Sequence, residues 1–322
     1  MPDIRTAGAD RFWMNLDGVL CSNVKTVSGG AISAPVIEQE AAAGGFAEKH
    51  IGAPTYGEFV VQVGLSSTPD LYAWISSSWT ASPERRDGSV VTADANGNAR
   101  SERRFTDARI TGVTVPTLDG SSKDAGYLTV TFAPELIQTQ PASGKLPAST
   151  TRPGKPWLCS NFRLELDGID TSRVATIESF TVSNAVAEDV VGDGRDLTLE
   201  AGRLEFPNLV VSVSAASAQS WETWFDDFVV SGDNGQSKEK SGAIVFLSSD
   251  VSTELGRVAL HNVGICALRA PTLGDNTEKV ARFSAELYCD WMELHVGAPA
   301  PPPSPVIPIR PEPRPTPIVP HR

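Results

Sequence analysis

The feature that most constrains this chain is an internal repeat, because a segment near its start recurs about 150 positions later. The run FWMNLDGV begins at Phe12, and FRLELDGI begins at Phe162. The same offset places FVVQV, from Phe59, on LVVSV, from Leu209. An offset that holds across loops of different composition indicates two copies of one structural unit, too few for a solenoid. At about 130 residues, each copy is long enough to be a domain.

The composition is that of a soluble folded protein and disfavours several classes of function. Of 322 residues, 40% are hydrophobic and 20% are charged, so neither copy should lack a core. The formal charge of −12 disfavours a nucleic-acid binder, which normally displays a basic patch. We expect no membrane span, since no apolar run is long enough, and no secretory signal, since the N-terminus is polar. The four scattered cysteines lack metal-ligand spacing, so we expect reduced thiols at Cys21, Cys159, Cys266 and Cys289.

Each copy is expected to be built mainly of β-strands. In the first, a strand from Phe12 reaches a turn at Asp17-Gly18, and a β-branched run, 58–65, predicts a second strand. Later runs alternate apolar with polar residues and predict a further pair of strands in each copy. The fold class predicted is therefore mainly β, with two tandem antiparallel β-barrel or sandwich domains, each with one flanking α-helix.

One amphipathic helix is predicted at the same place in each copy. In the first copy, Asp70 is the expected N-cap. The buried stripe follows at helical spacing, in Leu71, Trp74, Ile75 and Ser78. In the second copy Ser220 is the expected cap, and the stripe is Trp221, Trp224, Phe225 and Phe228. Packing on a sheet explains this period, so a ligand-binding aromatic box is the weaker interpretation.

The sequence divides into two domains joined and followed by proline-rich segments. The expected boundaries are 1–137 for the first domain, 138–158 for a Pro/Ser/Thr linker, 159–296 for the second domain and 297–322 for a disordered Pro-rich tail. Within the first domain, residues 29–57 are rich in Gly, Ala and Glu and are expected to form a long loop. Long loops in compact domains are usually functional or disordered.

No constellation of residues predicts an enzyme, a cofactor or a metal site. The motifs of common hydrolases, nucleotide-binding proteins and zinc sites are missing. Asp17 and Asp167 recur, but turn geometry explains an Asp before a Gly. An alternative is a carbohydrate-active or hydrolytic β-protein in which Trp13, Trp79 and Trp157 stack on sugars, although burial of these side chains is favoured.

Four segments of the first copy stand in an order typical of one known family. They are the run from Phe12, a Gly/Glu-rich arm ending at residues 48–52, the strand 58–65 and the helix segment 71–75. Over most of residues 10–135 the chain thereby resembles the tail-tube proteins of contractile phages, whose fold the Hcp tube of type VI secretion shares. The resemblance implies a small β-barrel with one helix and an extended arm, six barrels in a ring, and rings stacked into a tube. The second copy keeps the opening strand, the valine strand and the helix, but its acidic residues 183–205 lack a counterpart of the Glu-Lys-His-Ile run.

The resemblance implies a structural component of a phage-tail-like contractile injection apparatus, in a pseudo-sixfold ring of the inner tube or hub. Three two-domain chains or six chains would complete the ring. The implied inter-subunit arm includes Glu38, Glu40, Glu48, Lys49, His50 and Tyr56. Expected partners are further copies and neighbouring tube, sheath or baseplate proteins, in a virion tail or a cytoplasmically assembled particle. The alternative is a non-enzymatic binding module with a Pro-rich docking tail.

Overall fold

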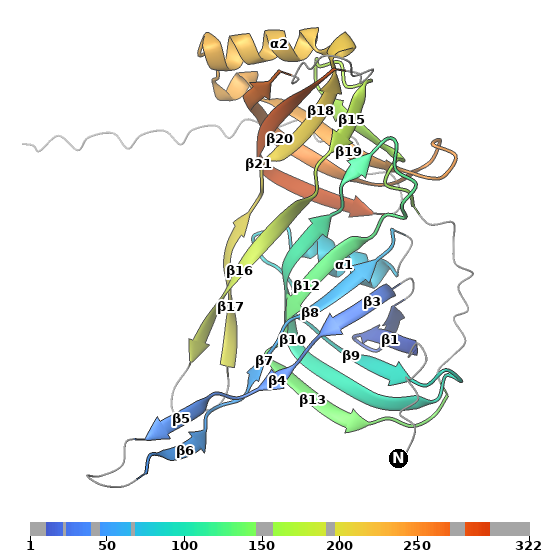
Figure 1. Ribbon diagram of the computed structural model, residues 1–322, viewed down its shortest axis with the longest axis vertical. Coiled ribbons are helices and arrows are strands. Elements are labelled where there is room, and N and C mark those ends of the chain that lie inside the picture. Colours follow the sequence, from blue (N-terminus) through green and yellow to red (C-terminus); the bar gives the residue numbers. More distant parts are fainter. Residues whose placement is uncertain are drawn as a thin grey trace, which may run out of the picture.

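The computed structural model describes residues 11–21, 24–39, 46–65, 68–145, 157–190, 197–270 and 281–296 (Figure 1). The mainly β class is confirmed, with 58% of the described residues in strands and 11% in helices. Glu40, most of the expected linker and the Pro-rich tail lie outside the described residues. Within the described part of the chain, no helix has the length and apolar character needed to cross a membrane.

The first sheet has the strand order β2-β1-β9-β10-β12-β8-β3, all in antiparallel pairs. Its strands are β1 (Arg11–Leu16), β2 (Val19–Cys21), β3 (Val24–Gly29), β8 (Phe59–Val63), β9 (Arg86–Ala93), β10 (Ala99–Val115) and β12 (Leu128–Ala133). The predicted turn joins β1 to β2. Its Asp17 and Gly18 both have positive φ, 47° and 83°, as expected of a tight hairpin turn.

The second sheet has the order β11-β15-β18-β21-β20-β19-β14. Its strands are β11 (Leu118–Asp119), β14 (Phe162–Leu166), β15 (Val174–Ile177), β18 (Leu209–Ser214), β19 (Lys240–Leu247), β20 (Glu254–Arg269) and β21 (Arg282–Val296). From β15 to β14 this order matches β3-β8-β12-β10-β9-β1 element by element. The registers agree as well, since Val61 pairs with Val130 and its counterpart Val211 with Ala285. A common order and register are what a tandem duplication would produce, and the duplication itself stays an inference.

The two predicted helices are present as α1 (Pro69–Ser77) and α2 (Gln219–Phe225), and a π-helical turn η2 (Asp226–Val230) extends the second. Their predicted stripes are buried, apart from the partly buried Phe225. Both predicted N-caps are wrong. Thr68 precedes α1 because Pro69, which lacks an N–H, occupies the first helical position. Ser220 lies inside α2, where its Oγ accepts a hydrogen bond from the backbone N–H of Asp170 at 3.1 Å.

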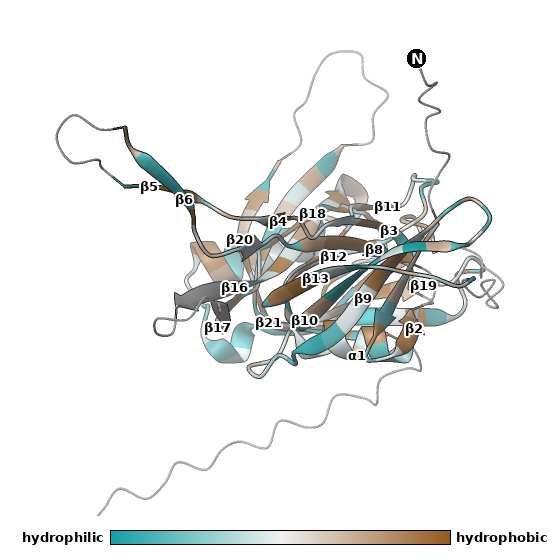
Figure 2. Cartoon of the chain, turned by 90° about the horizontal axis from the view of Figure 1, so that it is seen from below, coloured by the Kyte–Doolittle hydropathy of each residue, from teal (hydrophilic) through white to brown (hydrophobic). Residues whose placement is uncertain are grey.

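The expected long loop at 29–57 is instead a projecting β-hairpin, here called arm 1. It consists of β4 (Ile32–Ser33) paired with β7 (Thr55–Tyr56), and β5 (Val36–Gln39) paired with β6 (Glu48–Ile51). The loop prediction followed the Gly- and Ala-rich composition of the whole segment, but the strands are formed by other residues, among them Val36 and Ile51, and the Ala/Gly run at 41–45 lies outside the described residues. Figures 1 and 2 show that β5 and β6 extend away from the rest of the molecule.

The second copy has the equivalent hairpin, here called arm 2, formed by β16 (Phe180–Val190) and β17 (Leu197–Glu205). Ser33 pairs with Thr55 in arm 1, and Ser183 pairs with Glu205 in arm 2. The offset of 150 is thus kept in the backbone register, although the arm sequences differ. The sequence divergence that we noted in residues 183–205 therefore does not remove the hairpin.

The two copies exchange strands. Arm 2 pairs with the first sheet, since β16 lies along the last residues of β10. In return β11, which follows β10, pairs with β15 of the second sheet. A further strand, β13 (Leu136–Pro141), pairs with the first half of β10, so the opening residues of the expected linker belong to a strand. Trp157, at the other end of that linker, is 3% exposed and packs on Phe246.

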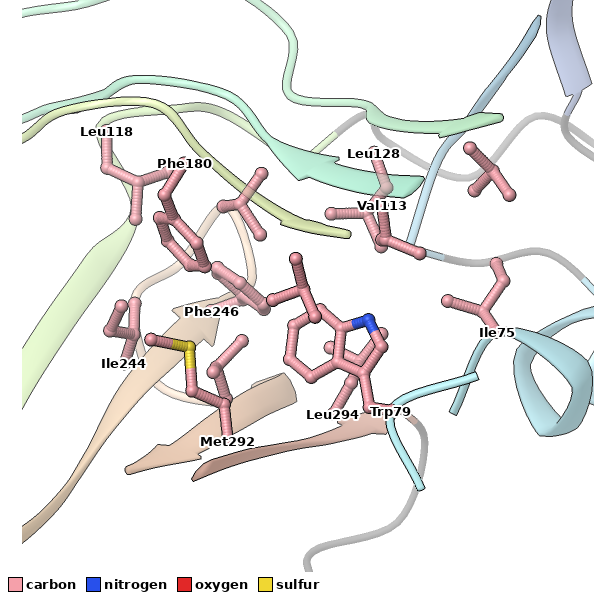
Figure 3. Packing of buried hydrophobic residues seen from close by; sticks show 14 of the residues in the cluster. Ile75, Trp79, Val113, Leu118, Leu128, Phe180, Ile244, Phe246, Met292 and Leu294 are labelled. Carbon is pink, nitrogen blue, oxygen red and sulfur yellow. The ribbon is translucent and has the colours of Figure 1, made fainter. Parts of the chain in front are cut away.

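The main hydrophobic core runs through both copies, and a small separate cluster consists of Ala243, Val245 and Leu247. Figure 3 shows Trp79 and Val113 of the first copy gathered with Phe180, Phe246 and Leu294 of the second. The hydroxyl of Ser76 also donates a hydrogen bond to the carbonyl of Leu294 at 2.8 Å. The copies are therefore packed against each other.

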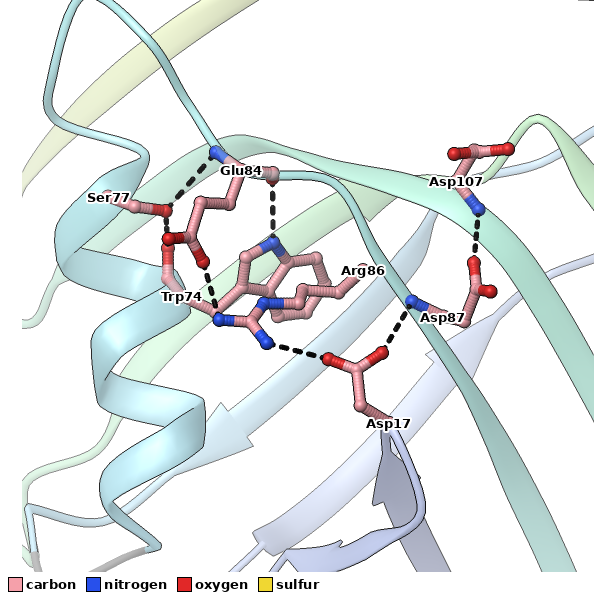
Figure 4. Close-up of polar contacts among 7 residues, drawn as sticks. All are labelled: Asp17, Trp74, Ser77, Glu84, Arg86, Asp87 and Asp107. Carbon is pink, nitrogen blue, oxygen red and sulfur yellow. Dashed lines mark hydrogen bonds and ion pairs between the residues drawn. The ribbon is translucent and has the colours of Figure 1, made fainter.

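A polar network fixes the end of α1 to the strands of the first sheet (Figure 4). The Trp74 indole donates to the carbonyl of Glu84 at 3.1 Å. Arg86 bonds Glu84 and donates to Asp17 at 2.7 Å, and the hydrogen bond with Asp17 raises the pKa of Arg86. Asp17 also accepts from the backbone N–H of Asp87 at 3.2 Å. The β1–β2 turn is thereby linked to the helix as well as to the strands.

Candidate assembly interface

The predicted arm residues lie on arm 1, except Glu40, which is outside the described part of the chain. Glu38 and Lys49 are a cross-strand pair, with Nζ 2.7 Å from Oε1. His50 lies beside Glu48, with Nε2 3.7 Å from the carboxylate. These four side chains are exposed, whereas Tyr56 at the base of the arm is partly buried against the core. The charged groups pair with one another along the arm, and exposed pairs of this kind add little to stability.

The more informative residues on arm 1 are apolar and were missed by the sequence analysis. Phe46 is 97% exposed and Ile51 is 75% exposed, although both are large apolar side chains. Val36 lies directly opposite Ile51, so these two share one face of the hairpin. Among the described residues of the arm, the other large exposed apolar side chains are Ile32 and Ile37. Since exposed apolar side chains grouped on one surface mark interaction sites, the Val36 and Ile51 pair makes the arm a candidate binding element.

Arm 2 shows what an arm can bind. Its first residues pair with β10 in four consecutive pairs, from Gly112↔Ser183 to Val115↔Phe180. The hydroxyls of Thr114 and Thr181 lie 2.8 Å apart across this ladder. The Val113↔Val182 pair is buried on both sides, at 1% and 2% exposure. An arm of this fold can therefore extend the sheet of a neighbouring barrel by backbone pairing and apolar contact.

No residue cluster among the described residues provides a metal site, as no three His, Cys, Asp or Glu side chains gather suitably. All four cysteines are free thiols. Burial raises the pKa of Cys21 to about 11 and that of Cys289 to about 12, which keeps both thiols protonated at neutral pH. Only Cys266, on β20, is exposed.

The remaining candidates for chemistry have structural surroundings. His261 stacks on Trp291 with ring centroids 4.5 Å apart, and burial lowers the pKa of His261. His295 lies 3.1 Å from the Glu293 carboxylate. Trp79 and Trp157 are buried, so neither presents a face for a sugar, and that alternative is wrong for these two residues.

Comparisons with known proteins concern the first copy above all. Residues 9–138 match the family model described as T4-like virus tail tube protein gp19. A comparison with curated proteins gives no match.

Similar solved structures come from contractile injection systems. The sheath–tube complex of the PVC extracellular contractile injection system contains a chain 22% identical, with a TM-score of 0.37 over 41% of this chain and 89% of that one. A chain of the tube-terminating cap of the anti-feeding prophage is 20% identical, with a TM-score of 0.37 over 44% of this chain and 93% of that one. A chain of the six-fold symmetrised baseplate of that prophage is 15% identical, with a TM-score of 0.33 over 47% of this chain and 97% of that one.

Proposed function

We propose that this chain, whose residues 9–138 carry the domain of the tail tube family, is a structural component of a phage-tail-like contractile injection apparatus. Its role is to form a ring of the inner tube or hub. The observation that carries the proposal is arm 1, a projecting hairpin with apolar side chains exposed on a domain of that family. Exposed apolar side chains grouped on a projecting element mark sites of contact with another protein.

The ring contains three chains, each supplying two tube-like domains with proposed boundaries 1–137 and 159–296. Support comes from the common strand order of the two sheets and from the way arm 2 joins them within one chain. A contact that joins non-identical surfaces head to tail produces a ring when the rotation closes, and a filament otherwise. Six such domains close the pseudo-sixfold ring that the resemblance implies.

The partners of the ring are neighbouring tube, sheath or baseplate proteins, in a virion tail or in an injection particle assembled in the cytoplasm. The proposed function is non-enzymatic, and it needs no cofactor. Arm 1 is the element proposed to contact the neighbouring subunits, through its exposed apolar residues and the charged residues predicted from the sequence.

The proposal is tested with the purified chain. Light scattering coupled to gel filtration measures the mass, and negative-stain microscopy looks for annuli with a central hole. We expect three-chain annuli, and a particle that stays monomeric at every concentration would contradict the proposal.

A variant of the same chain tests the arm. Replacing residues 36–51 by a short Gly-Ser turn keeps β4 and β7 and removes the exposed tip. We expect the variant to fold, since none of the described residues of this segment lies in the core, and to assemble poorly. Unchanged assembly would show that the tip has no part in it.

A further inference from the structure

We infer that residues 31–33 of one chain pair as an added strand with residues 267–269 of the next chain, in the register that arm 2 uses within the chain. The inference rests on the proposed function, because it names the partner surface of the proposed ring. It commits to a second copy of this chain as the occupant of an open sheet edge.

The acceptor edge is found by following the equivalence of the two copies. In the first sheet, Val113 pairs with Val130 on one side and with Val182 of arm 2 on the other. The second-sheet counterpart of Val113 is Leu268, which pairs with Ala285 on one side. Both strands carry the same irregularity just before this point, after Ile110 and after Ile265. Among the described strands, none lies on the other side of residues 267–269.

The donor strand is found in the same way. The counterparts of Thr181, Val182 and Ser183 at the offset of 150 are Ala31, Ile32 and Ser33. This segment pairs with β7 on one side only, in the described chain, as β16 pairs with β17. Its other edge is therefore free at the residues that arm 2 uses to bind β10.

Exposure of the apolar side chains agrees with a missing partner. Val182 is 2% exposed in its ladder, whereas the equivalent Ile32 is 49% exposed. On the acceptor side Val113 is 1% exposed, whereas the equivalent Leu268 is only partly buried. Each chain thus has two apolar side chains that lack a cross-strand partner, Ile32 on the donor strand and Leu268 on the acceptor strand. Pairing Ile32 with Leu268 of the next chain would bury both.

The same geometry predicts the complete register. Ser33 lies opposite Ala267, Ile32 opposite Leu268 and Ala31 opposite Arg269 of the neighbouring chain. Unpaired strand edges otherwise invite uncontrolled association, so a defined pairing also removes a hazard. Because the donor is in the first copy and the acceptor in the second, the contact is head to tail and repeats around the ring.

Disulfide trapping tests the register. In a Cys266→Ser background, which removes the exposed native thiol, Ser33→Cys is combined with Ala267→Cys. Directly opposed residues in antiparallel strands have Cα atoms about 4.5–5.5 Å apart, within the range a disulfide needs. Mild oxidation should give covalent dimers and trimers on a non-reducing gel.

The matched control combines Ser33→Cys with Arg269→Cys. Two residues further along the strand, the Cα separation rises to about 8 Å, beyond the reach of an unstrained disulfide. We expect about tenfold less cross-linking than with the Ala267 partner. Equal trapping of both pairs, or preference for the control, would overturn the inference.

The outcomes separate this inference from the proposed function. Annuli of the unmodified chain without the predicted cross-link would contradict the register and leave the function standing, whereas a monomeric chain would contradict both. Should the double-cysteine variant fail to fold, Ile32→Asp provides the test, with Val251→Asp, at another exposed site, as its control. If the two substitutions reduced ring formation equally, or if neither reduced it, the inference would also be overturned.

Discussion

Two glycines show how closely the copies agree at the level of single residues. A Cβ added at Gly88 would lie 2.4 Å from the carbonyl oxygen of Asn15. One added at Gly242 would lie 2.1 Å from the carbonyl oxygen of Glu165, the residue 150 positions after Asn15. Each glycine lets two paired strands approach closely, β1 with β9 and β14 with β19, so both copies meet the same steric requirement with the same residue.

Substituting either glycine by alanine is therefore expected to destabilise the protein. Because the clash is with the backbone, the strands must separate, and we expect Gly88→Ala and Gly242→Ala each to lower the free energy of unfolding by about 1–3 kcal/mol. Gly235→Ala is the control, since its Cβ would meet nothing within 4 Å. Urea denaturation measures all three, and a loss for Gly235→Ala as large as for the other two would refute the steric explanation.

The turn between β9 and β10 makes a prediction about pH. Asp94 accepts hydrogen bonds from the backbone N–H of Asn98 at 2.9 Å, from that of Asn96 at 3.0 Å, and from the Arg100 guanidinium at 3.0 Å. The bonds from Asn98 are the largest cause, and together these contacts lower the pKa of Asp94 from 3.8 to about 2. A lowered pKa in the folded state means that the stabilisation is complete above pH 3.8 and is lost as the pH falls towards 2.

Asp94→Asn should therefore be less stable than the parent at pH 6, and the difference should shrink as the pH falls from 4 to 2. The asparagine keeps a carbonyl acceptor but loses the charge, so it does not titrate. Urea midpoints of both proteins across this range provide the measurement. A difference that is constant with pH would show that the ionised carboxylate does not stabilise this turn.

At the scale of elements, the sequence predicted those helices and turns that depend on local residue patterns. Both helices followed from an apolar stripe at helical spacing, and the opening hairpin followed from Asp17-Gly18. The arms could not be predicted in this way. The Gly- and Ala-rich composition of arm 1 indicated a loop, whereas the strand pairing of Val36–Gln39 with Glu48–Ile51 depends on partners across the hairpin. The resemblance implied charged residues as contacts, while the exposed Phe46 and Ile51, recognisable only once burial is known, were missed.

The two arms provide a matched pair of substitutions. Val182 is buried against β10 of its own chain, so Val182→Ala should cost roughly 2 kcal/mol of unfolding free energy. The equivalent Ile32 is half exposed, so Ile32→Ala should cost less than about 0.5 kcal/mol in the dilute chain. Denaturation at low protein concentration compares them. Equal losses would mean that arm 1 is covered within the chain as arm 2 is.

At the scale of the whole molecule, the two copies are not independent domains joined by a linker. β16 of the second copy pairs with β10 in the first sheet, and β11 of the first copy pairs with β15 in the second sheet. Each copy therefore contributes a strand to the sheet of the other. Sequence spacing located the two copies, but it could not reveal this exchange, because strand pairing between distant segments leaves no local pattern. The proposed interface between chains follows the pattern of this observed interface inside one chain.

This exchange predicts how the chain unfolds. Separated halves, residues 1–150 and 151–322, would expose Val113 and Val115 on one side and Phe180 and Val182 on the other, all buried in the intact chain. We therefore expect one cooperative unfolding transition for the whole chain, and halves that are poorly soluble alone but co-purify when expressed together. Calorimetry of the intact chain and pull-down of a tagged half measure the two effects. Two separate transitions, with each half retaining its stability in isolation, would show that the shared core contributes little and that each domain folds by itself.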